Sequence, residues 1–132
     1  VAPEALSCIQ LKNEYWAGRI NEFHRQGLDV FVNITNPKNE IENCEYKSCF
    51  LSYSEAFALA KHSKKIVSLR SGLTEFLMAT GVEIEVLYTP FRNRFVFKDL
   101  PVEPVMTGFS LSKLPHDDSQ KVEEKYIGVC NE

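Results

Sequence analysis

The chain has 132 residues, of which 44% are hydrophobic and 11% aromatic, and this is enough apolar material for the core of one domain. Its formal charge of −3 arises from interspersed acidic and basic residues, so no basic face predicts nucleic acid binding. No apolar run approaches the 18 to 20 or so residues that cross a bilayer, and the N-terminus lacks a signal-peptide pattern. We therefore expect a cytoplasmic protein without a transmembrane segment, which could associate with a membrane at its periphery.

The four cysteines are too few and too dispersed for a disulfide scaffold, so we expect free thiols at Cys8, Cys44, Cys49 and Cys130. No second Cys or His pair stands at metal-ligand spacing from Cys44 and Cys49, and no metal site is predicted. The chain opens on Val1-Ala2-Pro3-Glu4, which has the pattern of the end of a strand. We expect a piece of a longer protein.

The first helix and strand have clear local signals. Apolar residues three and four apart predict a helix over 14–26, which Asn13 caps and which Gly27 ends in a left-handed conformation. The β-branched and aromatic run over 28–34 then predicts a strand. A polar loop over 37–46 follows.

The middle of the chain alternates strands and short helices. After a short strand over 48–51, the spacing of Ser52 and Glu55 predicts a capping box and a second helix. The apolar run 66–69 predicts a strand buried on both faces. A third helix begins near Leu73 and ends at Gly81, and alternation over 82–88 predicts another strand.

Strands separated by short helices require right-handed crossovers, which place helices on both faces of a mostly parallel sheet. We therefore predict a doubly wound, Rossmann-like α/β domain over 1–90. Residues 91–132 form an irregular C-terminal extension that we expect to pack on the same domain. It contains a possible strand over 95–97, and Asp117-Asp118 is predicted to cap a final amphipathic helix through Val122 and Tyr126.

The best candidate site is Arg70-Ser71-Gly72-Leu73-Thr74-Glu75, which stands where a strand ends and a helix begins. Ligands of open parallel sheets bind beyond the carboxyl ends of the strands. The free N–H groups of a helix start favour an anion, Gly72 allows close backbone approach, and Arg70 can neutralise a phosphate. Glu75 could accept hydrogen bonds from sugar hydroxyls. The same segment also fits a helix merely capped by Ser71, and spacing alone favours neither interpretation.

Other chemistry has weaker support. At the junction after Val1–Glu4, Ser7 could meet a phosphate or belong to an ordinary polar turn. A hydrolase is disfavoured because Glu83 and Glu85 share the outer side of one strand, and because no nucleophile converges with a histidine. The histidines are His24, His62 and His116.

Four segments together resemble the C-terminal, donor-binding half of GT-B glycosyltransferases. The resemblance covers about residues 1–90, and it is nearest to bacterial enzymes of capsular and surface polysaccharide synthesis and more remote to heptosyltransferases. Its most specific part is Arg70 to Leu73. The segments are Ala2-Pro3-Glu4-Ala5, Glu14-Tyr15-Trp16, Gly27-Leu28-Asp29-Val30 with Asn33, and Ser54-Glu55-Ala56 with the run from Ile66 to Glu75.

The resemblance implies that the chain binds a nucleotide sugar as donor substrate and needs no cofactor or metal. By position, the residues from Arg70 to Thr74 would hold the diphosphate and Glu75 the ribose. In GT-B enzymes, an N-terminal domain binds the acceptor and usually supplies the catalytic base. This chain has no room for such a domain. The chain alone would bind the donor without turnover, and its catalytic residues stay unassigned.

Two other interpretations are open. The first is a non-enzymatic flavodoxin-like interaction or regulatory domain whose polar loops are only helix caps. The second is a small phosphate-ester enzyme, which would need a nucleophile or a metal-binding acid at the end of a strand. Neither Asp29 nor Asp99 has that position.

Overall fold

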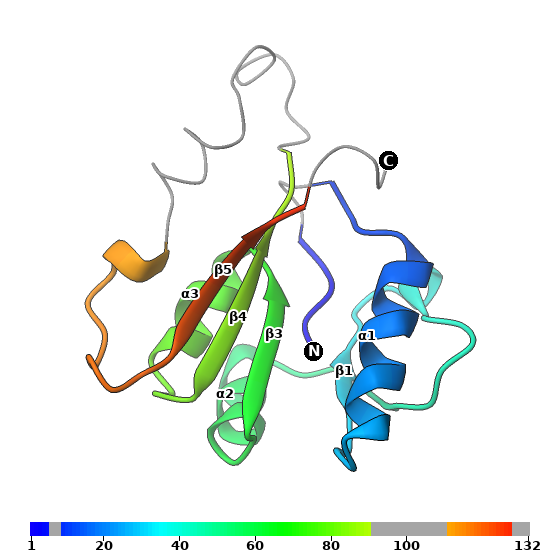
Figure 1. The fold of residues 1–132 in the computed structure, drawn as a ribbon, viewed down its shortest axis with the longest axis horizontal. Helices are drawn as coiled ribbons and strands as arrows, with labels where there is room; N and C mark the ends of the chain where they lie inside the picture. The colour runs from blue at the N-terminus through cyan, green and yellow to red at the C-terminus, as the bar shows by residue number, and fades with distance from the viewer. Residues whose placement is uncertain (6–8, 91–110, 128–132) are drawn as a thin grey trace.

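The computed structural model describes residues 1–5, 9–90 and 111–127 (Figure 1). Within these residues, no helix is long and apolar enough to span a membrane. The elements in chain order are α1 (Asn13–Arg25), β1 (Phe31–Asn33), the 3-10 helix η1 (Pro37–Asn39), β2 (Lys47–Cys49), α2 (Tyr53–Lys61), β3 (Lys65–Leu69), α3 (Gly72–Met78), β4 (Glu83–Tyr88), the 3-10 helix η2 (Leu111–Lys113) and β5 (Val122–Tyr126).

The strands of the described residues pair in parallel, in two small sheets of order β1-β2 and β3-β4-β5. The N-terminal residues lie between the two sheets: Asn33 N donates to Val1 O at 2.9 Å, and Leu69 N donates to Ala2 O at 2.9 Å. Read across both sheets, the order is β2, β1, Val1–Ala2, β3, β4, β5. This confirms the predicted mostly parallel α/β architecture, and it is compatible with a Rossmann-like fold.

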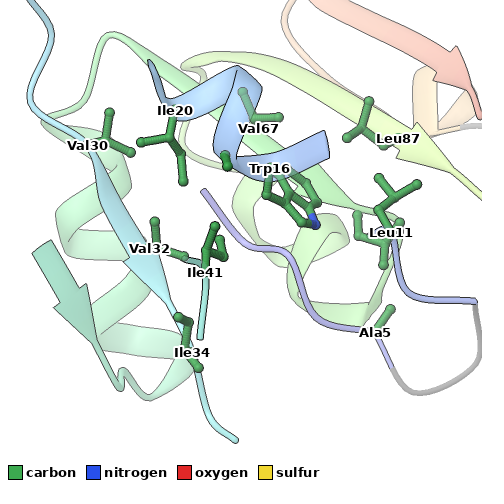
Figure 2. Close-up of a cluster of buried hydrophobic side chains, with 12 residues drawn as sticks. Ala5, Leu11, Trp16, Ile20, Val30, Val32, Ile34, Ile41, Val67 and Leu87 are labelled. Atoms are coloured by element: carbon green, nitrogen blue, oxygen red, sulfur yellow. The ribbon is translucent and has the colours of Figure 1, made fainter. Parts of the chain in front are cut away.

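Helices cover both faces of these strands, as the sequence predicts. Because successive residues of a strand point to opposite faces, Ile66 and Val67 of β3 belong to different cores. Val67 packs with Trp16 and Ile20 of α1, which lie among the strand side chains in Figure 2. Ile66 packs with residues of α2 and α3, of which Leu77 is one. Thus α1 lies on one face, and α2 and α3 lie on the other.

The start of α1 differs from the prediction in one detail. The N-cap position is Lys12, whose side chain makes no capping hydrogen bond, and helix geometry begins at Asn13 itself. The Asn13 amide donates to Glu40 O at 2.9 Å and accepts from Glu42 N at 3.0 Å. It therefore fastens the following loop to the helix. Gly27, with φ +79°, adopts the predicted left-handed conformation.

The prediction of a final helix through Val122 and Tyr126 is wrong, because these residues form β5 at the edge of the sheet, parallel to β4. A spacing of four fits a strand of period two as well as a helical turn, and pairing with β4 decides between them. Asp117 does not cap a helix; its carboxylate accepts from Ser119 N at 2.8 Å in a turn. The strand proposed over 95–97 lies outside the described residues.

Candidate functional site

A pocket of about 540 Å³ lies at the carboxyl ends of several strands, and we call it the carboxyl-edge pocket. Its walls come from the residues after Val1–Ala2, β1 and β2 and from the starts of α2 and α3. The strand order reverses here, between Val1–Ala2 and β3, and open α/β sheets bind ligands at such a point. The volume is also typical of small-molecule sites. The carboxyl-edge pocket is therefore the candidate site.

The structure separates the predicted site residues into three groups. Ser71, Gly72 and Leu73 line the carboxyl-edge pocket. Arg70, Thr74 and Glu75 are adjacent in sequence but do not belong to its lining. Ser7 lies outside the described residues.

The first turn of α3 is held by a reciprocal capping box. Ser71 Oγ accepts from Thr74 N at 3.4 Å, while Ser71 N donates to Thr74 Oγ1 at 3.0 Å. The fully buried Thr74 also donates to Leu69 O at 2.8 Å. The first two N–H groups of a helix have no intrahelical acceptor, and those of Gly72 and Leu73 make no hydrogen bond to the described residues. The cap thus leaves two backbone donors at the pocket wall.

Arg70 and Glu75 contact each other. Arg70 Nη2 donates to Glu75 Oε1 at 2.6 Å, and Arg70 Nη1 donates to Ser71 O at 3.0 Å. The Arg70 side chain is 15% exposed and that of Glu75 is 51% exposed. An arginine already paired with a carboxylate must exchange partners before it can bind a phosphate fully.

Glu4 is one of the pocket residues that the sequence analysis missed. Its carboxylate accepts from Thr35 N at 2.5 Å, from Asn36 N at 3.2 Å and from Asn39 Nδ2 at 2.5 Å. Burial raises the pKa of Glu4, but these hydrogen bonds outweigh burial and hold the pKa below its ordinary value. Glu4 therefore fixes the segment after β1 in the pocket wall. In the sequence, this polar wall is indicated by asparagines at intervals of three, at positions 33, 36 and 39.

A second cavity, of about 430 Å³, lies between β1 and β3 and reaches α2 and α3. Its lining includes the apolar side chains of Leu59 and Leu77, and its Lys65 already pairs with Glu85. A ligand site needs a few fixed polar groups that converge on one position. The carboxyl-edge pocket meets that requirement better.

The cysteines and acids offer no alternative site in the described part of the chain. Cys44 and Cys49 are free thiols, and burial raises the pKa of each. In residues 1–5, 9–90 and 111–127, no group of three or more His, Cys, Asp or Glu side chains could hold a metal ion. Cys8 and Cys130 lie outside these ranges.

No protein-family model, curated protein or solved structure matches this chain.

Proposed function

We propose that the chain binds a nucleotide sugar in the carboxyl-edge pocket, as the Rossmann-like donor-binding domain of a GT-B glycosyltransferase. One observation carries the proposal. Ser71, Gly72 and Leu73, to which the sequence resemblance assigns the diphosphate, line a pocket where the strand order reverses. The process would be bacterial surface polysaccharide synthesis in the cytoplasm.

The chemistry of the α3 start suits a diphosphate. Gly72 and Leu73 offer N–H groups without an acceptor in the described residues, and the dipole of the helix adds a partial positive charge. Gly72 has no side chain to keep the phosphate oxygens away from the backbone. Such fixed donors would also stabilise the charge that develops on the diphosphate when the sugar leaves, so the mechanism needs no metal or other cofactor.

Arg70 and Glu75 would change partners when the donor binds. Arg70 would turn from Glu75 to a phosphate oxygen, and the released Glu75 carboxylate would accept hydrogen bonds from the ribose. The exposure of Glu75, 51%, leaves its side chain room for this movement. Thr74 would act through the cap, and Ser7 would be a further phosphate ligand.

An N-terminal acceptor domain would be the partner of this chain. It would supply the acceptor and the catalytic base across a cleft, as in other GT-B enzymes. The 132-residue chain would then bind the donor but would not turn it over.

Calorimetric titration with UDP, GDP, ADP and CMP tests the proposal. One nucleotide should bind, and Arg70→Ala should weaken its binding by about 1.5 to 3 kcal/mol, because a charged hydrogen bond is lost. Arg25→Ala is the matched control, since Arg25 lies at the end of α1 that leads into the amino end of β1. The absence of binding for all four nucleotides would contradict the proposal.

The alternative is a non-enzymatic, flavodoxin-like interaction or regulatory domain. The capping box of Ser71 and the ion pair of Arg70 with Glu75 favour it, because these side chains have partners without a ligand. The same titration distinguishes the two functions, since only the donor-binding domain requires nucleotide affinity at Gly72 and Leu73.

A further inference from the structure

One wall of the carboxyl-edge pocket, formed by the end of β1 and the segment after it, contains three asparagines, Asn33, Asn36 and Asn39. Two of them use their amide oxygen to hold the backbone. Asn33 Oδ1 accepts from Leu51 N at 3.0 Å, and Asn36 Oδ1 accepts from Lys38 N at 3.0 Å. A backbone N–H can only donate, so these contacts identify the oxygens. The NH₂ groups of Asn33 and Asn36 make no hydrogen bond to the described residues.

Asn39 has the opposite arrangement. Its Nδ2 donates to Glu4 Oε2 at 2.5 Å, and a carboxylate that also receives two backbone N–H groups can only accept. The amide oxygen of Asn39 is therefore the group left without a partner in the described part of the chain. The wall thus offers two donor groups and one acceptor.

Local structure holds this wall in place before any ligand arrives. Glu4 accepts the N–H groups of Thr35 and Asn36, and Asn36 caps the 3-10 helix η1. Asn13 of α1 binds the backbone on the far side of η1. Binding here would require little new ordering of the protein.

The charges of the lining distinguish among ligands. Glu4 is the only formally charged side chain among the described residues that line the carboxyl-edge pocket. This wall therefore does not suit a second anion. Hydroxyl groups both donate and accept, which matches the free groups of the asparagines. Tyr53 also lines the pocket; it is 52% exposed, and its aromatic face could pack on a ring while its hydroxyl remains available.

We propose that Asn33, Asn36 and Asn39 bind a neutral, polyhydroxylated ring of the ligand, and that Glu4 is the residue that positions Asn36 and Asn39. The inference rests on the proposed function, since the ring would belong to the same nucleotide sugar. Both the ribose and the transferred sugar have this chemistry. Because the proposed function assigns the ribose to Glu75, we expect the transferred sugar at the asparagines.

The test uses Asn33→Asp and Asn36→Asp in the 132-residue chain. Each variant keeps the oxygen that binds Leu51 N or Lys38 N but replaces the free NH₂ by an acceptor. Ser54→Asp is the charge-matched control, because Ser54 lies in the first turn of α2 next to Tyr53 but does not line the pocket. Asn36 is exposed, so Asn36→Asp should fold even if Asn33→Asp does not.

Three probes are titrated into each variant: inorganic pyrophosphate, the nucleoside diphosphate that binds best, and its nucleotide sugars. We expect each asparagine variant to weaken binding of the nucleotide sugar at least about tenfold. The affinity for the nucleoside diphosphate should change no more than it does in Ser54→Asp. If the asparagine variants weaken binding of the nucleoside diphosphate but not of pyrophosphate, the same asparagines bind a ring, and that ring is the ribose.

Two results would overturn the inference. If all three variants weaken the nucleotide sugar by the same factor, the asparagines do not bind the ring, although the proposed function stands. If the wild-type chain binds no nucleotide, the inference fails together with the proposed function.

Discussion

The guanidinium of Arg19 in α1 donates two hydrogen bonds, each of 2.6 Å, to the carboxylate of Glu85 in β4. Glu85 is fully buried, and Lys65 and Lys125 approach the same carboxylate at 3.1 and 3.0 Å. Burial raises the pKa of Glu85, but the three cations outweigh it and lower the pKa to about 2. The cluster therefore joins α1 to β3, β4 and β5.

We predict that Arg19→Met lowers the free energy of unfolding by about 2 to 4 kcal/mol, because the buried Glu85 carboxylate loses its closest partner while two lysines remain. Urea denaturation measures the change. Lys121→Met is the control: the Lys121 side chain is 72% exposed, its ammonium lies 3.6 Å from Glu83, and the pair should contribute less than about 0.5 kcal/mol. Equal small effects of the two variants would contradict the assigned role of the cluster.

The Glu85 cluster also predicts a pH dependence. The pKa of Glu85 in the folded chain, about 2, is below the ordinary value of 4.5. The carboxylate therefore stabilises the fold fully above pH 4.5, and this stabilisation is lost as the pH falls toward 2. The difference between these two pKa values corresponds to roughly 3 kcal/mol in the free energy of unfolding. Urea denaturation at several pH values should therefore show that the free energy of unfolding falls less with decreasing pH in Glu85→Gln than in the wild type. A fall of the same size in both would refute the prediction.

Glu4→Gln should loosen the pocket wall without unfolding the chain. Glutamine keeps one acceptor oxygen for the N–H groups of Thr35 and Asn36 but loses the other, at a cost of about 1 to 2 kcal/mol. Hydrogen exchange of the Thr35 and Asn36 amides should accelerate. The control Glu22→Gln changes an exposed residue of α1 and should leave both rates unchanged.

Gly72→Ala separates binding from stability. A Cβ at position 72 would lie 3.2 Å from the hydroxyl of the half-exposed Tyr53, which can shift, so the stability should change by less than about 1 kcal/mol. Nucleotide affinity should nevertheless fall about tenfold, because the methyl group stands between the backbone and the diphosphate.

The control for that variant is Gly18→Ala. No atom lies within 4 Å of a Cβ at position 18, in the middle of α1, so the chain should gain about 0.5 to 1 kcal/mol and bind nucleotide unchanged. An unaltered affinity in Gly72→Ala, measured calorimetrically beside this control, would argue against a close backbone contact with the ligand.

Features with a local cause could be predicted from the sequence. Ser52 and Glu55 form the predicted capping box, and the strand ending at Leu69 is buried as its apolar run indicates. Gly27 and Gly81 adopt the positive φ that ends a helix. In each case, the residues that determine the conformation are neighbours in sequence.

Features with a distant cause could not be predicted. Glu85 alternates with apolar residues and was expected on the outer side of its strand, but it is buried because Arg19, 66 positions earlier, pairs with it. Glu4 meets the loop after β1 across more than 30 positions. The pairing of β4 with Val122–Tyr126 likewise depends on an arrangement that local periodicity does not contain.

Amide chemical shifts of the 132-residue chain, recorded during titration with UDP, GDP, ADP and CMP, test donor binding most directly. We predict that one nucleotide produces saturable shifts that are largest at Gly72 and Leu73, whose N–H groups are the proposed diphosphate ligands, while Gly18 in α1 does not move. Saturating amounts of all four nucleotides without shifts at Gly72 and Leu73 would contradict the proposed function.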